Sequence, residues 1–383
     1  MVAKQTFRIL HLASSERWTG IAEPVVSLAR EQQKDGHDVW LACVPGRSFE
    51  RRARQNGLRV LTQLHLDRRL NPLRFCRDLA GIRRFVQENH IEIVHSHLLH
   101  DNWLATLALL GLSKPPLLVR TFHRWEPPRA DWLHKWLLAR RNDLTITTSR
   151  SLLGLFDQRI PLAPGKATVV YGGVDYERFR PDLSGATFRR EVNLAPDAPV
   201  AGIVARMAVG RGHRWLLEAA PEVARRIPEA RILLIGRGPL KRPLRAEISS
   251  TRLRDNVLMV GYRRKDLPET YAALDLALFL GMGSEGTCRA VLEAMATGRP
   301  VIAIAAGPLP EVVENGKTGI LVEPDNVQAL ADAIVRLLSD RPECERMGRA
   351  ARQSILDRFT ERKRSDDTIQ AYRAVWHRKS GEG

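Results

Sequence analysis

The chain has 383 residues, of which 44% are hydrophobic and 27% are charged. This length is large for one hydrophobic core and suits two domains of ordinary size. No apolar run reaches the length of a membrane-spanning helix. Lys4 and Arg8 interrupt the short apolar stretch at the N-terminus, which favours a first strand over a signal peptide. Four widely spaced cysteines exclude a disulfide framework and a cysteine-based metal site, so we expect a cytoplasmic protein.

The formal net charge of +17 at pH 7 indicates an anionic partner. Nucleic acid, an anionic membrane or glycolipid, and a polyanionic substrate all fit this charge. No zinc-finger or RNA-recognition motif accompanies it, so nothing points to a specific nucleic acid. Part of the excess consists of arginine pairs such as Arg51–Arg52 and Arg140–Arg141, which are typical of solvated helix faces.

Strands and helices alternate in the first half of the chain. Residues 7–13 form an apolar run typical of a buried parallel strand, and a polar loop then leads to an amphipathic helix over residues 21–34. Gly20 in that loop would either let a ligand approach the backbone or simply turn the chain into the helix. Further strands are expected at residues 38–44, 91–95, 117–121, 144–148 and 168–171.

Three histidines and three tryptophans stand out in this half. His95 and His97 follow one expected strand and His123 follows the next, at the edge where α/β sheets bind ligands. A single histidine at such a place is more often a packing residue. A segment with three tryptophans and several basic residues is interpreted as a helix with its tryptophans packed inward, or alternatively as a surface for an acceptor or a membrane: Trp125, Trp132, Trp136, Arg124, Arg129, Lys135 and Arg140.

The second half begins again with a buried strand at residues 200–205, followed by Arg206, the glycine-rich segment 210–212 and a helix. Two arginines beside a strand-to-helix turn favour an anion site over a solvated surface. Further strands are expected at residues 231–236, 257–262 and 276–280, and a late helix at residues 327–338. The Gly-x-Gly at residues 236–238 lacks a third glycine and runs into a proline, so we reject a dinucleotide-binding fingerprint.

Residues 281–304 form the most informative stretch. The pattern predicts a polar loop, a helix that starts near Thr287, a stop at Gly298 and a buried strand at residues 301–304. The N-terminus of that helix would present unpaired N–H groups to an anion. Glu285 and Glu293 lie in this stretch with seven residues between them. Glu293 falls among apolar residues, where a carboxylate needs a partner or a ligand; alternatively, both glutamates are ordinary surface residues.

The stretch resembles the Glu-x7-Glu signature of a large family of retaining glycosyltransferases (family 4-like, group 1), including the Ala-Met-Ala-x-Gly-x-Pro-Val-Ile that follows. Resemblance extends over nearly the whole chain, with Gly36-His37 and residues 172–175 matching family steps in the first half. It implies an α/β protein of GT-B fold, in which two doubly wound Rossmann-like domains face a central cleft. It also implies a nucleoside-diphosphate sugar as donor substrate and no cofactor.

The family resemblance implies roles for particular residues. His123 and Glu285 would position the donor sugar, Glu293 would bind the ribose, and Arg206 and Arg211 would clasp the diphosphate. Arg211 stands where the family has lysine, and a planar guanidinium does not bind phosphate as a compact ammonium does. Backbone groups would hold the sugar and the diphosphate at Gly20, Gly286, Thr287 and Cys288.

The domains and metal requirement are expected as follows. Residues 1–178 would form the acceptor-side domain, 179–199 a linker, 200–360 the donor domain, and 361–383 a C-terminal helix that crosses back to the first domain. No Asp-x-Asp pair occurs in the sequence. We therefore expect a metal-independent enzyme with no metal ligands.

The function expected is transfer of a sugar to a glycan or lipid-linked acceptor in cell-envelope polysaccharide or lipopolysaccharide assembly. The enzyme would be cytoplasmic, with peripheral contact to an anionic membrane as an option. Two alternatives stay open: a nucleotide-sugar epimerase or hydrolase of the same fold, and a non-catalytic basic protein that binds a surface or nucleic acid. The intact Arg206, Glu285 and Glu293 argue against a degenerate donor site.

Overall fold

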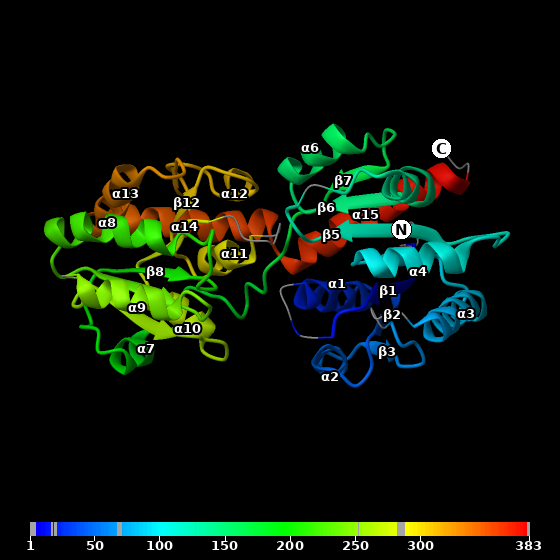
Figure 1. Cartoon of the computed structure of the whole chain (residues 1–383), viewed down its shortest axis with the longest axis horizontal. Coiled ribbons are helices and arrows are strands. Elements are labelled where there is room, and N and C mark those ends of the chain that lie inside the picture. Colours follow the sequence, from blue (N-terminus) through cyan, green and yellow to red (C-terminus); the bar gives the residue numbers. More distant parts are fainter. Residues whose placement is uncertain are drawn as a thin grey trace. The chain divides into compact units, whose positions relative to one another are not determined.

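The computed structural model describes residues 5–16, 18, 21–66, 71–126, 128–251, 253–281 and 288–380. Within these residues the chain divides into two compact units, each with its own parallel β-sheet (Figure 1). Unit 1 contains the residues up to Gly172 and those from Glu361 onward, and unit 2 contains those from Gly173 to Thr360. No helix in the described ranges is long and apolar enough to cross a membrane.

The sheet of unit 1 has seven strands in the order β3-β2-β1-β4-β5-β6-β7. These strands are β1 (Arg8–Ala13), β2 (Asp38–Cys43), β3 (Arg59–Leu61), β4 (Ile93–Ser96), β5 (Leu117–Phe122), β6 (Leu144–Thr147) and β7 (Ala167–Val169). The helical segments are α1 (Ala22–Lys34), α2 (Ser48–Gln55), α3 (Pro72–Glu88), α4 (Leu99–Leu109), α5 (Trp132–Lys135), the π-helix η1 (Trp136–Arg141), α6 (Arg150–Arg159) and α15 (Glu361–Ser380). The short edge strand β3 carries no apolar alternation, and the sequence did not predict it.

Helices cover both faces of this sheet because successive strand residues point to opposite faces. On β1, Ile9 belongs to a core cluster that includes Val25 of α1 and Ile369 of α15. The next residue, Leu10, belongs to a different cluster that includes Leu104 of α4. Unit 1 is therefore a doubly wound three-layer domain, and the C-terminal helix forms part of one outer layer.

Polar contacts also attach α15 to unit 1. The Arg364 guanidinium donates to Ser27 Oγ at 2.8 Å, and the Tyr372 hydroxyl lies 2.6 Å from His95 Nδ1. Arg30 pairs with Glu361 at 3.0 Å, at the start of the helix. These contacts tie the last helix of the chain to α1 and β4, near its beginning.

The sheet of unit 2 has six strands in the order β10-β9-β8-β11-β12-β13. These strands are β8 (Val200–Val204), β9 (Arg231–Ile235), β10 (Val257–Gly261), β11 (Leu276–Phe279), β12 (Val301–Ile304) and β13 (Gly319–Val322). The helices are α7 (Ala186–Glu191), α8 (His213–Arg226), α9 (Lys241–Ser250), α10 (Leu267–Ala272), α11 (Arg289–Ala296), α12 (Leu309–Val312), α13 (Val327–Ser339) and α14 (Arg341–Arg358). The strands expected in this half all occur; β12 has the expected bounds, and β8, β9, β10 and β11 each end one residue earlier than expected.

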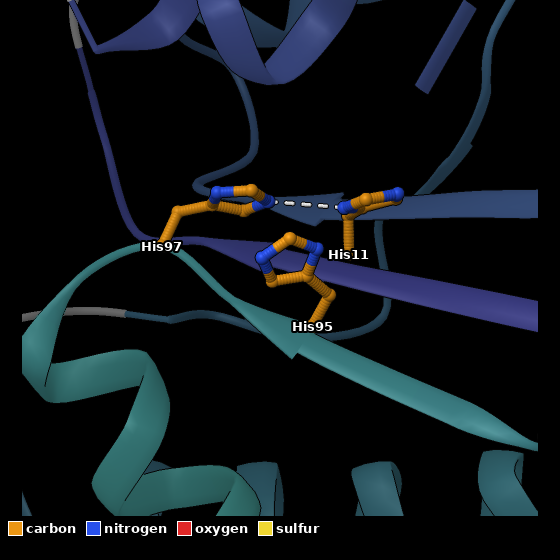
Figure 2. Close-up of side chains that lie close together, drawn as sticks. All are labelled: His11, His95 and His97. Atoms are coloured by element: carbon orange, nitrogen blue, oxygen red, sulfur yellow. Dashed lines mark hydrogen bonds between the residues drawn. The ribbon is translucent and has the colours of Figure 1, made fainter. Parts of the chain in front are cut away.

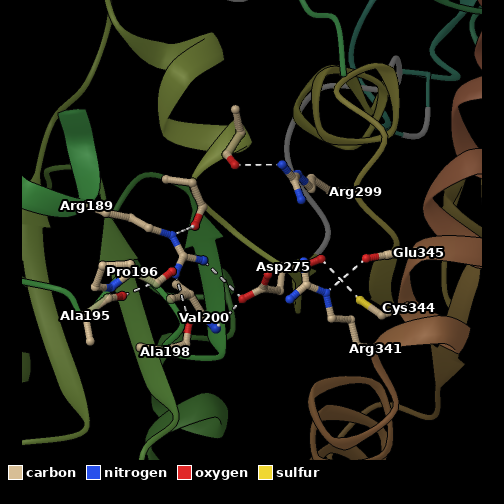
Figure 3. A network of polar contacts seen from close by, with 12 residues as sticks. Arg189, Ala195, Pro196, Ala198, Val200, Asp275, Arg299, Arg341, Cys344 and Glu345 are labelled. Atoms are coloured by element: carbon tan, nitrogen blue, oxygen red, sulfur yellow. Dashed lines mark hydrogen bonds and ion pairs between the residues drawn. The ribbon is translucent and has the colours of Figure 1, made fainter. Parts of the chain in front are cut away.

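Residues 179–199, which we expected to be a linker, lie in unit 2 and contain helix α7. Arg189 on this helix donates to the carbonyl oxygens of Pro196 and Ala198 at 2.8 and 2.9 Å, and to Asp275 at 3.2 Å (Figure 3). A cavity of about 320 Å³ borders this network, with Arg299 in its lining. Asp275 precedes β11, so the cavity lies at the amino edge of the sheet, away from the edge where ligands bind in such folds.

Candidate functional site

The expected donor-binding residues of unit 2 follow two neighbouring strands. β8 pairs with β9 on one side and with β11 on the other, so the strand order changes direction at β8. In doubly wound sheets, ligands bind beyond the carboxyl ends of the strands at this switch point. Arg206 and Arg211 follow β8, and Cys288 precedes α11, the helix after β11.

Glycines bring the backbones after β8 and β11 into contact. A Cβ atom on Gly212 would lie 2.3 Å from the Leu280 carbonyl oxygen, and one on Gly281 would lie 2.1 Å from the Gly210 carbonyl oxygen. Gly212 also has φ +76°, which disfavours any residue with a side chain. The two loops therefore meet at the switch point because glycine stands on each side.

The positive charge at this edge is not neutralised within the described ranges. Arg206 is exposed and Arg211 is half-buried, and neither forms an ion pair with a residue that the structure describes. Both precede α8, whose first N–H groups add partial positive charge. His213, at the start of α8, is buried. Its pKa is lowered to about 4, mainly by burial and to a smaller extent by the positive charge of Arg211. The edge therefore suits an anion such as a diphosphate.

Glu293 is buried in α11, with 6% of its surface exposed. Its Oε1 accepts a hydrogen bond from Arg289 Nε at 2.8 Å, and Tyr271 Oη lies 3.5 Å from its Oε2. The pKa of Tyr271 is raised, mainly by burial and secondly by the negative charge of Glu293. We had singled out neither partner from the sequence, although the four-residue spacing between Arg289 and Glu293 is the signal for such a pair.

Helix α11 begins later than expected. We predicted a start near Thr287, but the helix begins at Arg289, with Cys288 as its N-cap residue at φ +48°. This left-handed conformation is unfavourable for a residue with a Cβ atom and cannot continue a helix. Four expected binding residues lie outside the described residues: Gly20, Glu285, Gly286 and Thr287.

In unit 1, His123 lies beyond β5 and is buried together with three other histidines. The sheet order places β1, β4 and β5 side by side, and His11 is directly opposite His95 in the register. His97 Nδ1 lies 3.0 Å from His123 Nε2, and His97 Nε2 lies 3.0 Å from His11 Nδ1. The sequence drew attention to His95, His97 and His123, but we did not single out His11.

Burial keeps these four imidazoles neutral. It lowers the pKa of His11 to about 4 and that of His123 to about 3. The pKa values of His95 and His97 lie well below the usual range for the same reason. The Arg364 guanidinium adds repulsion against a charged imidazole at all four positions.

Ring nitrogens of His11, His95 and His97 lie within 4.8 Å of one another, which is close enough for one metal ion (Figure 2). Each of the three rings, however, uses both nitrogens in hydrogen bonds. His95 contacts Tyr372 and Thr121. His11 and His97 contact each other, and their remaining nitrogens contact Gln32 and His123, respectively. An ion would have to displace these bonds, so the hydrogen-bond network accounts for the cluster without one.

Comparisons with known proteins agree with this architecture. A family model described as "Glycosyltransferase Family 4" matches residues 18–178, and one described as "Glycosyl transferases group 1" matches residues 185–354. Among solved structures, a glycosyltransferase from Rickettsia africae has a TM-score of 0.85 at 18% identity and covers 97% of this chain and 99% of its own. Anabaena HepE in complex with UDP has a TM-score of 0.81 at 22% identity and covers 96% and 100%.

Sequence relatives match part of the chain. A GDP-mannose-dependent alpha-(1-6)-phosphatidylinositol monomannoside mannosyltransferase of Mycolicibacterium smegmatis is 33% identical over 50% of this chain and 52% of its own length. A lipopolysaccharide core biosynthesis mannosyltransferase of Rhizobium meliloti is 30% identical over 54% and 58%. The chain thus spans about half the length of the curated relatives it matches. With its two family matches and its pair of parallel sheets, this chain belongs to the family 4, group 1 glycosyltransferases and has their GT-B fold.

Proposed function

We propose that this chain transfers a sugar from a nucleoside-diphosphate sugar to an acceptor, with retention of configuration and without a metal ion. The observation that carries the proposal is the switch point of unit 2. There Arg206 and Arg211 stand without described ion-pair partners, beside the N-terminus of α8. Cleavage of a sugar–diphosphate bond builds negative charge on the departing phosphate, and preoriented cations and N–H groups stabilise that charge.

Known relatives support a nucleotide-sugar donor. The mycobacterial relative is named as GDP-mannose-dependent, and the Anabaena structures contain UDP or UDP-glucose. In our proposal His123 and Glu285 position the sugar of this chain's donor, and Glu293 binds the ribose. Since Glu293 already accepts from Arg289, the ribose would share this carboxylate with the guanidinium. We favour uridine as the base.

The acceptor proposed is a glycan or lipid-linked glycan of the cell envelope. The exposed face of α5 supports this: Trp132 has 74% and Leu133 has 42% of its surface exposed, next to exposed Lys135. We favoured inward packing for these tryptophans, but the exposure of Trp132 excludes it for that residue. An exposed tryptophan beside lysine and arginine suits an anionic membrane surface, where peripheral binding would bring a lipid-linked acceptor close.

Thermal unfolding with a panel of uridine, guanosine and adenosine diphosphates tests the donor site. A matching diphosphate at one hundred times its Kd should stabilise the protein by about 2.7 kcal/mol. The matching monophosphate should stabilise less, because the arginines act on the second phosphate. Arg211→Ala should reduce the difference between the two nucleotides. Arg225→Ala, at the far end of the same helix, should not.

Product analysis tests the reaction itself. Release of the nucleoside diphosphate should depend on an added acceptor, and the new glycosidic bond should keep the configuration of the donor. Conversion of the donor without an acceptor would favour an epimerase or hydrolase. A folded protein that no diphosphate stabilises would contradict the proposal.

A further inference from the structure

The buried histidines of unit 1 form an ordered chain of hydrogen bonds. Gln32 Oε1 lies 2.7 Å from His11 Nε2. On the other side of this ring, His11 Nδ1 lies 3.0 Å from His97 Nε2, the contact drawn in Figure 2. His97 Nδ1 lies 3.0 Å from His123 Nε2. The remaining nitrogen, His123 Nδ1, is buried and has no hydrogen-bond partner within the described residues. This series of hydrogen bonds therefore runs from Gln32 on α1 across β1, β4 and β5 and ends at Nδ1 of His123.

His95 lies among these rings but is not part of this chain. Its Nδ1 lies 2.6 Å from the Tyr372 hydroxyl, and its Nε2 lies 2.7 Å from Thr121 Oγ1. Both of its nitrogens are therefore occupied by hydroxyl groups. His95 provides a control of the same residue type, in the same cluster and equally buried.

Because the imidazole rings are neutral, the donor and acceptor of each hydrogen bond in this series can be assigned. A neutral imidazole has one N–H donor and one acceptor nitrogen. Because the Gln32 carbonyl oxygen can only accept, His11 must donate from Nε2 and accept at Nδ1. His97 must then donate from Nε2 and accept at Nδ1, so that His123 donates from Nε2. His123 is left with a bare Nδ1, which is an acceptor.

The opposite direction does not match the placement of the Gln32 amide. It would require the Gln32 amide to turn and would leave a proton on His123 Nδ1. That N–H group would be buried without a described partner. Gln32 Nε2 is likewise buried without a described hydrogen-bond partner, so the number of unpaired N–H groups is similar in both directions, and the placement of Gln32 Oε1 at 2.7 Å from His11 Nε2 decides between them. We therefore assign the direction from the Gln32 carbonyl oxygen.

We propose that Gln32, His11 and His97 are positioning residues that hold His123 in the Nε2–H tautomer, so that Nδ1 accepts a hydrogen bond from a hydroxyl group of the donor sugar. The ligand part rests on the proposed function, whereas the tautomer does not. A sugar hydroxyl supplies a neutral donor. A phosphate oxygen has no proton to offer at neutral pH, and the nearby Arg364 and Arg120 disfavour a cation.

The first measurement reads the tautomer in the ligand-free full-length chain. Long-range ¹H–¹⁵N NMR of protein labelled with ¹⁵N-histidine separates protonated from bare ring nitrogens, and His123→Gln identifies the signals of His123. We expect a proton on Nε2 and a bare Nδ1. A proton on Nδ1 of His123 in the wild-type chain would overturn the proposal without any variant.

Two substitutions of His97 each remove a different hydrogen bond of the histidine network. The amide of asparagine is near the place of Nδ1, so His97→Asn can still accept from His123 Nε2. The amide of glutamine is near the place of Nε2, so His97→Gln keeps the contact to His11 but not the contact to His123. We expect His97→Asn and the control His95→Gln to keep the wild-type tautomer of His123, and His97→Gln to give a mixture of both tautomers.

Donor kinetics test the ligand part. His97→Gln should raise the KM for the nucleotide sugar about three- to tenfold, the worth of one hydrogen bond, with a smaller change in kcat. His97→Asn should recover most of that loss. Equal tautomer populations or equal KM values in the two His97 variants would overturn the proposal. Failure of the proposed function would show separately, as a wild-type chain that no nucleoside diphosphate stabilises.

Discussion

Arg289 and Glu293 form an ion pair one turn apart on α11, with 2.8 Å between Arg289 Nε and Glu293 Oε1. The side chains are 18% and 7% exposed, so water screens this pair little. Arg289 thereby neutralises the charge of a buried carboxylate. The residue that we expect to bind the ribose is thus held in one position by its own helix.

Removal of the cation of this pair should destabilise the fold. In Arg289→Ala the buried Glu293 carboxylate loses the cation that neutralises it, so the free energy of unfolding should fall by about 3 kcal/mol in denaturant titrations. Arg346→Ala is the control, because Arg346 pairs with Glu343 at 3.6 Å and is itself 54% exposed. Its effect should stay below about 1 kcal/mol. Equal effects of the two variants would contradict a buried pair.

The two glutamates of the motif should affect different kinetic parameters. Glu293→Ala removes a charged hydrogen-bond acceptor and should weaken donor binding by about 1–3 kcal/mol. Glu285→Ala should chiefly lower kcat, and both variants should fold. Calorimetric titration of the donor and steady-state kinetics separate these effects. Full transfer activity in Glu285→Ala would sink the role given to that residue.

Chelation should leave activity unchanged. In our proposal Arg206, Arg211 and helix N–H groups stabilise the departing diphosphate, which is the work that a divalent ion does in metal-dependent enzymes. Initial rates should therefore be equal with EDTA and with added magnesium. Loss of activity with EDTA and its return with magnesium or manganese would refute metal independence.

Stability should fall on acidification below about pH 6.5. Burial lowers the pKa of five histidines in the folded protein: His11, His95, His97, His123 and His213. The unfolded chain therefore binds more protons between their folded pKa values and about 6.5, so it gains stability as the pH falls through this window. Burial has the opposite consequence for Asp101, whose pKa it raises to about 6, so that this carboxyl favours the folded state on acidification.

Five histidines outweigh one carboxyl, so the melting temperature should drop between pH 7 and pH 5. Scanning calorimetry over this range checks the prediction. A stable variant that replaces His11 by glutamine should show a smaller drop than the wild-type chain. A melting temperature that does not change from pH 7 to pH 5 would contradict the buried neutral histidines.

Membrane contact through α5 predicts binding to anionic vesicles that weakens as salt rises. Trp132→Ala should weaken binding to these vesicles in sedimentation assays. Leu73→Ala is a matched control, since Leu73 lies on another helix of unit 1 and is equally exposed, at 74%. Equal binding to neutral vesicles, or tighter binding to duplex DNA, would count against a membrane role.

Much of the sheet structure was determined by the local sequence. Strand β12 has the bounds that we predicted, and β8, β9 and β11 differ by one residue at one end, because short apolar runs closed by glycine or proline have few alternatives in a parallel sheet. The short helix α7 was not predicted, because its segment has no periodic apolar pattern. Tertiary contacts of Arg189 hold it in place instead. Propensity is a weak guide where such contacts decide.

The motif around α11 could also be recognised from the local sequence. Glu293 lies on α11 and is only eight positions from Glu285 in the sequence, so the motif can be recognised without the tertiary structure. The start of α11 was placed too early, because Cys288 adopts a left-handed conformation that residue type does not signal. Arg289 could have been found from its spacing to Glu293.

The histidine chain was decided only by the tertiary structure. His11 and His97 are separated by 86 residues, and nothing in the sequence around either one names the other. They meet because β1 pairs with β4 and β4 with β5, with His11 opposite His95 in the register. Strand order in a doubly wound sheet depends on how crossovers pack helices over both faces, which is a property of the whole domain. The sequence by itself therefore determined which residues lie on the strands or directly after them, and the packing of the sheet decided which of these residues touch.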